Sequence, residues 1–152
     1  MIRDLFDLHG KTALVTGSSR GLGLAIARGL AEFGARVALH GSRSVPADAL
    51  ATLNEAQPGA IAVTGDVSDP AACIRIVEQV LEQFGTIDIL INNAGTIRRA
   101  PAAEHAWEDW NAVLETNLSS VFRLSQLAGK HMLAQGSGKI GDLTGALDLS
   151  KP

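Results

Sequence analysis

TALVTGSSRGLG, residues 12–23, is the stretch that decides the fold of this chain of 152 residues. It begins with a short apolar run, Thr12 to Thr16, typical of a strand that is covered on both faces of a sheet. A turn with three glycines follows. After it the apolar residues recur at helical spacing from Leu22 to Phe33, and Gly34 supplies the stop signal. The stretch therefore predicts a strand, a tight turn and a helix in direct succession.

Strand and helix patterns alternate along the rest of the chain. Alternation of this kind implies right-handed crossovers, so we expect an α/β fold with a doubly wound, Rossmann-like parallel sheet. A fifth strand begins at Lys139-Ile140 and then loses its pattern. We therefore expect a sheet that is incomplete after strand four or five, with residues 1–140 as a truncated dinucleotide-binding domain and 141–152 as a divergent tail. The other expected strands are 36–40, 60–64 and 87–92, and the other expected helices are 46–56, 70–84 and 107–135.

Two of these helices have clear apolar spacing and end signals. Asp69 and Pro70 form a cap followed by a proline suited to the first helical turn, and Gly85 ends that helix. The apolar stripes are Leu22, Ile26, Leu30 and Phe33 on the first helix, and Ile74, Val77, Val80, Leu81 and Phe84 on the third.

The glycine turn has the physical features of a site for a dinucleotide. Gly17 permits a sharp turn, Gly21 lets the backbone approach a pyrophosphate, and Gly23 allows close packing of the helix. The start of the helix presents unpaired N–H groups and the positive end of its dipole. The turn lies between a predicted strand and a predicted helix, which is the context that such a motif requires.

Three motifs in this order resemble the short-chain dehydrogenase/reductase family: Thr16 to Gly23, Asn92-Asn93-Ala94-Gly95, and Asn117. The resemblance covers roughly Asp7 to Ile140. It implies an NAD(P)-dependent oxidoreductase that transfers a hydride between nicotinamide and a hydroxyl or keto group. It also implies a mainly structural role for Asn92. The cofactor-binding residues that it implies, together with two arginines considered below, are Gly17, Ser19, Arg20, Gly21, Leu22, Gly23, Arg43, Asp66, Val67, Asn93, Ala94 and Gly95.

The end of the second strand favours NADP over NAD. NAD-selective sites usually place Asp or Glu there for the ribose hydroxyls, whereas residues 39–43 read LHGSR and contain no acid. Arg20 and Arg43 are placed where a guanidinium could pair with a 2′-phosphate. We expect NADP as cofactor, with NAD as the alternative.

The family's catalytic group is a serine, a tyrosine and a lysine with a helical asparagine, and only the asparagine has a counterpart here. Asn117 matches it, whereas the chain contains no tyrosine. After Ile140 the sequence departs from the family, through either an internal deletion or a change of reading frame. We therefore expect this chain to be incomplete and catalytically inactive alone. The alternatives are a non-catalytic nucleotide-binding module or a non-functional remnant.

The substrate expectation rests on the residues that follow the fourth strand. Phe6-Asp7-Leu8 and Gly95 to Pro101 resemble the sugar-acid branch of the family, which implies a small-molecule substrate of that class. Arg98 or Arg99 could meet its carboxylate, although both also suit an exposed loop. The family's oligomer-forming helices correspond to 107–135, so we expect a homo-oligomer through that helix.

Composition excludes several other classes. The net charge of −3 provides no electrostatic footprint for nucleic acid or an anionic membrane surface. No apolar run approaches the length of a membrane span, and Asp4 and Asp7 fall where a signal peptide would be apolar. Cys73 is the single cysteine, so no internal disulfide can form. We expect a cytoplasmic protein.

Overall fold

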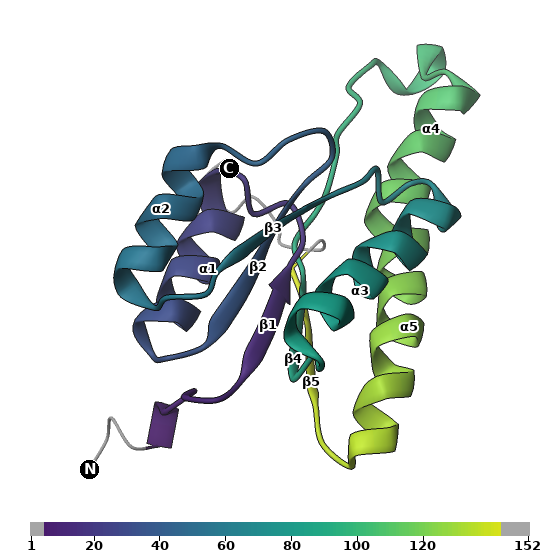
Figure 1. Ribbon diagram of the computed structural model, residues 1–152. Helices are drawn as coiled ribbons and strands as arrows, with labels where there is room; N and C mark the ends of the chain where they lie inside the picture. The colour runs from purple at the N-terminus through teal and green to yellow at the C-terminus, as the bar shows by residue number, and fades with distance from the viewer. Residues whose placement is uncertain (1–4, 144–152) are drawn as a thin grey trace.

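The apolar runs of the sequence form one parallel sheet of five strands, in the order β3-β2-β1-β4-β5. The computed structural model describes residues 5–143, and the expected α/β doubly wound fold is confirmed (Figure 1). The strands are β1 (Thr12–Val15), β2 (Arg36–Gly41), β3 (Ile61–Thr64), β4 (Ile89–Asn92) and β5 (Lys139–Asp142). The helices are α1 (Gly21–Glu32), α2 (Ala47–Ala56), α3 (Pro70–Phe84), α4 (Trp107–Leu114) and α5 (Ser120–Gln135), with a short 3-10 helix at Ala102–Glu104.

The helices cover both faces of the sheet because successive strand residues point to opposite sides. Ala13 and Val15 of β1 pack with α1 and α2, whereas Leu14 packs in the other cluster with α3 and α5. Figure 1 shows the same division, with α1 and α2 on one side of the sheet and α3 and α5 on the other. The strand order reverses between β1 and β4, so the connections diverge there and leave a crevice at the carboxyl ends of the strands.

The helix ends follow the predicted signals at α3. The Asp69 side chain accepts a hydrogen bond from the Ala71 N–H at 3.0 Å, Pro70 is the first helical residue, and Gly85 adopts the left-handed conformation with φ +78°. These contacts satisfy backbone groups that would otherwise be orphaned at each end of the helix.

The buried faces of α1 and α3 agree only in part with the predicted stripes, since Val77, Val80 and Phe84 of α3 are buried as expected. Gly23, Ala27 and Ala31 form the buried face of α1, whereas Leu22 is 60% exposed. Small residues occupy this face because α1 lies close to the sheet. On α3 the buried face is rotated toward Cys73 and Ile76, so Ile74 is 45% exposed.

The predicted single helix over 107–135 contains a change of helical type. The π-helical segment Glu115–Ser119 separates α4 from α5, and the chain continues in nearly the same direction through it. A π turn of this kind inserts an extra residue into the ladder and re-aims the side chains around it. Asn117 lies at the centre of this segment.

Strand β5 continues beyond the expected pattern. It pairs in parallel with β4 from Lys139 opposite Ile89 to Asp142 opposite Asn92. Gly141 and Asp142 therefore extend the strand by two residues beyond the expected Lys139-Ile140. The remainder of the expected tail, residues 144–152, lies outside the described residues.

Candidate functional site

A cleft of about 760 Å³ opens at the carboxyl ends of the strands, where the strand order reverses. The loops after β1, β2, β3 and β4 border it, and the start of α1 and one side of the α4–π segment complete it. The predicted cofactor residues that line it are Gly17, Ser19, Arg20, Gly21, Leu22, Asp66, Val67, Asn93, Ala94 and Gly95. Gly23 and Arg43 do not line it. Lining residues that were not expected from the sequence include His40, Gly41, Ser42, Ser68, Thr96, Asn111, Ala112, Glu115 and Thr116.

Each of the three glycines of the loop is required for a different physical reason. Gly17 has φ +62° and faces Ala94, whose Cα would lie 2.8 Å from an added Cβ. Gly21 has φ +58°, and a Cβ there would point into open space. Gly23 packs against the Asn93 amide and the Gly17 carbonyl oxygen, with no room for a Cβ. The loop is therefore held by close contacts at Gly17 and Gly23 and is open at Gly21, which lines the cleft.

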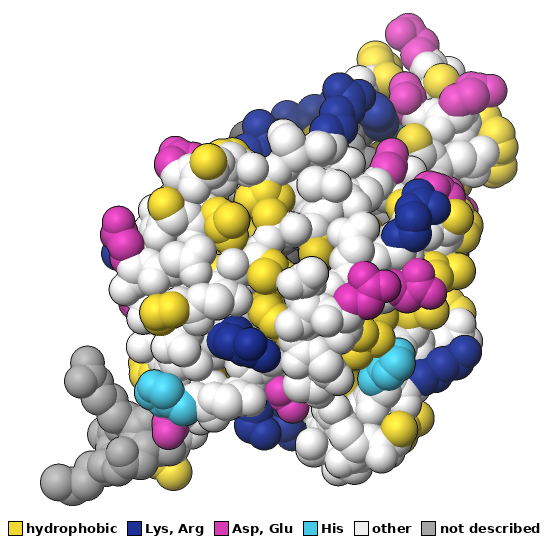
Figure 2. All heavy atoms as spheres, viewed as in Figure 1, with side chains coloured by type: hydrophobic (Ala, Val, Ile, Leu, Met, Phe, Trp, Pro, Cys, Tyr) yellow, Lys and Arg dark blue, Asp and Glu magenta, His cyan; other side chains and the backbone are white. Residues whose placement is uncertain are grey.

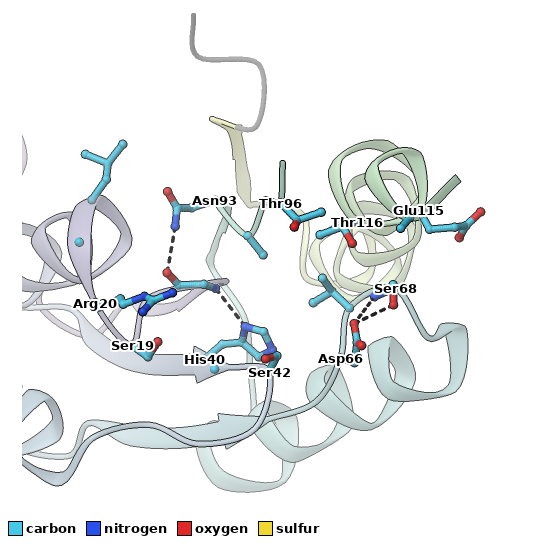
Figure 3. A pocket seen from close by; sticks show the side chains of 18 of the residues that line it. Ser19, Arg20, His40, Ser42, Asp66, Ser68, Asn93, Thr96, Glu115 and Thr116 are labelled. Carbon is cyan, nitrogen blue, oxygen red and sulfur yellow. Dashed lines mark hydrogen bonds between the residues drawn. The ribbon is translucent and has the colours of Figure 1, made fainter. Parts of the chain in front are cut away.

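The loop after β4 is fixed to the end of β1 by one hydroxyl and one amide. Thr16 Oγ1 accepts the backbone N–H groups of Asn93 and Ala94, each at 3.0 Å. The Asn93 amide donates to the Thr16 carbonyl at 3.0 Å and to the Gly17 carbonyl at 3.1 Å. Asn93 thus lines the cleft while its amide holds the glycine loop (Figure 3).

His40, at the end of β2, is buried and connects two loops. Its Nδ1 accepts the Gly17 N–H at 3.0 Å, and its Nε2 is 2.8 Å from the Gly65 carbonyl oxygen. Its backbone N–H donates to Ser18 Oγ, and its carbonyl accepts the Ser18 N–H, both at 2.9 Å. Burial lowers the pKa of His40 below its usual 6.5, against smaller opposing effects of the Gly65 carbonyl and the Asp66 carboxylate.

We expect His40 to make the fold sensitive to acid. Because its pKa is lowered in the folded chain, the unfolded chain binds the proton more readily, so stability is complete above about pH 6.5 and falls as the pH drops through the folded pKa. The loss can reach about 1.4 kcal/mol per pH unit. Urea unfolding from pH 8 to 5 should show a steeper loss in the wild type than in His40→Asn. Parallel curves for the two proteins would contradict the expectation.

Asn117 holds the start of the loop that follows Gly95. Its Oδ1 accepts the Thr96 N–H at 2.8 Å and its Nδ2 donates to the Thr96 carbonyl at 2.9 Å. Both polar atoms of the amide serve a segment that is distant in sequence, so Asn117 positions the loop at the edge of the cleft.

Replacing Asn117 should release this loop. Asn117→Leu removes both bonds and leaves two backbone groups of Thr96 without these partners, which should cost about 1–3 kcal/mol of unfolding free energy. Hydrogen exchange of the Thr96 amide should accelerate at the same time. Ser119→Ala in the same π segment is the control and should leave Thr96 exchange unchanged. Slow exchange at Thr96 in Asn117→Leu would show that the amide does not hold the loop.

Charged side chains at the cleft are arranged around Asp66 and Arg20. The Ser68 N–H and hydroxyl donate to Asp66 at 2.9 and 2.8 Å and lower the pKa of its carboxyl, and Arg43 adds a weaker effect in the same direction. Asp66 therefore stays ionised at neutral pH. Arg20 and Ser42 both line the cleft, whereas Arg43 acts on Asp66 without lining it.

The two arginines after β4 differ in position. Arg98 lines the cleft, and its Nε lies 3.7 Å from Asp109 of α4. Arg99 does not line it. The structure thus separates the two candidates for a substrate carboxylate and leaves Arg98 as the one at the cleft.

Asn92 lies behind the cleft at the end of β4. It is 1% exposed, and its amide donates to Ser125 Oγ of α5 at 3.1 Å. Its Oδ1 has no hydrogen-bond partner among the described residues. The contact joins the sheet to α5, as the expected structural role requires.

Known proteins are similar to this chain over most of its length. A family model described as short chain dehydrogenase matches residues 11–143. Gluconate 5-dehydrogenase of Gluconobacter oxydans is 46% identical over 139 residues, which are 90% of this chain and 54% of that protein. A 2-dehydro-3-deoxy-D-gluconate 5-dehydrogenase of Pseudoalteromonas atlantica is 46% identical over 138 residues, 89% of this chain and 54% of that protein.

A solved structure shows the same architecture. Gluconate 5-dehydrogenase from Burkholderia cenocepacia, in complex with NADP and tartrate, superposes with a TM-score of 0.79 at 38% identity. The match covers 93% of this chain and 56% of that one. The chain therefore spans about half the length of the relatives that it matches.

Two kinds of feature are absent from residues 5–143. No helix in this range is long and apolar enough to cross a membrane. The same residues contain no cluster of three or more His, Cys, Asp or Glu side chains that could hold a metal ion.

Proposed function

The chain belongs to the short-chain dehydrogenase family, and on that premise we propose that its cleft binds a nicotinamide dinucleotide, NADP in preference to NAD. The observation that carries the proposal is the start of α1. Its first turn opens onto the cleft beside Gly17 and Gly21, where free N–H groups and the helix dipole favour a pyrophosphate. Asp66 and Val67 border one end of the cleft, and Asn93 to Gly95 border the other.

The preference for NADP is supported by the groups at the end of β2. His40 is buried and bonded to two loops, Gly41 and Ser42 complete the lining of the cleft at this strand end, and Arg20 lines the same cleft. Neither Gly41 nor Ser42 offers the carboxylate that would bind two ribose hydroxyls, and the guanidinium of Arg20 suits a phosphate. The related Burkholderia structure holds NADP.

Calorimetric titration of the chain with NADPH and NADH tests the proposal. We expect tighter binding of NADPH. Arg20→Ala should weaken NADPH binding by about tenfold and leave NADH nearly unchanged, because a charge-assisted bond to phosphate is lost. Arg28→Ala is the matched control, since Arg28 pairs with Glu32 on the exposed side of α1. An equal loss for both nucleotides in Arg20→Ala would contradict the assignment of Arg20 to the 2′-phosphate.

For the whole protein we propose hydride transfer between the nicotinamide and a hydroxyl or keto group of a sugar acid. The bound nicotinamide would supply the hydride chemistry. Arg98 would meet the substrate carboxylate while Asp109 orients its guanidinium, and Asn117 would hold the loop at Thr96. The names of the relatives support this substrate class.

The chain itself supports a second candidate, a nucleotide-binding module without turnover. It contains no tyrosine to serve as the family's proton donor. We expect NADPH to bind and gluconate or 5-keto-gluconate to be left unreacted. Nucleotide oxidation or reduction at ordinary enzyme rates by this chain would contradict that expectation.

We also propose contact with another subunit along α4 and α5. Trp107, Trp110, Leu118 and Phe122 are all more than half exposed, and Figure 2 shows hydrophobic side chains along this edge of the molecule. Such a stripe favours burial against a partner. Sedimentation of the wild type and of Phe122→Lys tests this proposal. We expect a dimer or larger in the former and a smaller species in the latter.

A further inference from the structure

His40 is a buried side chain that ties two borders of the cleft together. One ring nitrogen holds the glycine loop after β1 through Gly17, and the other holds the connection after β3 through Gly65. Figure 3 shows the ring beneath the glycine loop, with Asn93 directed at the same loop from the other side. The peptide groups of Gly17 are therefore clamped between two side chains, Asn93 at the carbonyl and His40 at the N–H.

The partners of the ring fix its proton. A backbone N–H can only donate, so Nδ1 must accept from Gly17, and the proton must lie on Nε2, where it meets the Gly65 carbonyl oxygen. The neutral ring thus satisfies both loops. A second proton would have to be placed on Nδ1, where it would face the Gly17 N–H, and two donors cannot bond to each other.

We propose that His40 is a positioning residue for the nucleotide: its neutral imidazole holds the Gly17 N–H and thereby the loop that meets the phosphates, and a proton added at Nδ1 releases the loop and weakens binding. This inference rests on the proposed nucleotide site. It adds a residue whose protonation controls the site. Because His40 is deeply buried, no more than the edge of its ring could contact the nucleotide.

The charges around the ring leave the neutral form favoured. Asp66, on the connection after β3, is the charged group whose field reaches the ring, and it favours the added proton. Arg43, on the connection after β2, lowers the pKa of the Asp66 carboxyl, and Arg20 of the glycine loop carries the same sign as Arg43. Burial of the ring outweighs the carboxylate and lowers the pKa.

The test compares two variants of the 152-residue chain by calorimetry with NADP⁺ at pH 8. In His40→Asn the amide oxygen replaces Nδ1 as acceptor for Gly17, and the amide does not titrate. We expect this variant to bind within about threefold of the wild type. His40→Leu leaves the Gly17 N–H buried and unpaired and should bind about tenfold more weakly. Equal losses in the two variants would overturn the proposal.

The pH profile separates positioning from a merely structural role. From pH 8 to 5 the dissociation constant of the wild type should rise, by at most about tenfold per pH unit, because nucleotide binding is linked to one proton. His40→Asn should lack this rise. His9→Asn, whose native side chain is 73% exposed, should follow the wild type. Identical profiles for the wild type and His40→Asn would overturn the proposal.

A nucleotide-free measurement keeps this inference distinct from the proposed function. The Gly17 amide signal in NMR should shift together with protonation of the His40 ring. If NADP⁺ does not bind at pH 8, the proposed function fails, and the Gly17 signal still decides the positioning role. A Gly17 amide that ignores the His40 titration would overturn it.

Discussion

Gly23→Ala should destabilise the chain by about 3 kcal/mol and abolish most nucleotide binding, although it adds a single methyl group. The Cβ would lie 2.5 Å from the Gly17 carbonyl oxygen and 2.9 Å from the Ser18 Cα, and it would also collide with the Asn93 amide. The amide cannot turn aside freely, because it donates to Thr16 and Gly17. The clash therefore falls on backbone, where overpacking usually costs 1–3 kcal/mol or more.

Two glycines of the same region provide matched controls. Gly21→Ala meets no atom within 4 Å, so only its positive φ should cost about 1 kcal/mol. Gly29→Ala lies in α1 with open space around it and should stabilise by about 0.5–1 kcal/mol. Urea unfolding measures all three variants. A loss in Gly23→Ala no larger than in Gly21→Ala would show that the contact of Gly23 with the loop is not tight.

Thr16→Val should be nearly as damaging, with a loss of about 2–4 kcal/mol. The substitution keeps the shape of a 1%-exposed side chain but removes the oxygen that accepts the Asn93 and Ala94 N–H groups. Each buried N–H left without a partner costs about 1–3 kcal/mol. The loop after β4 should then lose its place beside Gly17, and NADPH affinity should fall with it.

Thr16→Ser is the matched control for the hydroxyl. It retains the acceptor and removes only a methyl group, so its loss should stay near 1 kcal/mol. Thermal or urea unfolding and NADPH titration of both variants give the comparison. Equal losses in Thr16→Val and Thr16→Ser would mean that the methyl group matters more than the two hydrogen bonds.

The sheet and the glycine loop could be predicted because their signals are local. Strands β1 to β4 are each marked by their own apolar run, and the cap at Asp69 and the stop at Gly85 directly flank the helix that they end. The faces of the helices were less predictable. Alanines and Gly23 cover the sheet on α1 where larger residues were expected, because the distance between helix and sheet is a tertiary property that spacing does not encode.

The missed parts of the site depend on contacts between distant residues. In the sequence, His40 is only part of a strand end that contains no acidic residue. The fold is what brings its ring to Gly17 and Gly65. Asn117 was matched to the family's asparagine. Its partner Thr96 could not be predicted, because the contact depends on how the π segment orients the amide. Arg43 was expected to bind the cofactor, but it does not line the cleft, and its charge lowers the pKa of the Asp66 carboxyl.

We propose above that the cleft between the β1 and β4 loops binds a nicotinamide dinucleotide. Amide NMR shifts of the 152-residue chain during NADPH titration test it most directly. We expect saturable shifts at Gly17, Ser19, Gly21, Asp66 and Ala94, with little change at Leu53 in the α2 core. Absence of saturable shifts, or shifts confined to residues outside the cleft, such as Phe6 and Phe33, would contradict it.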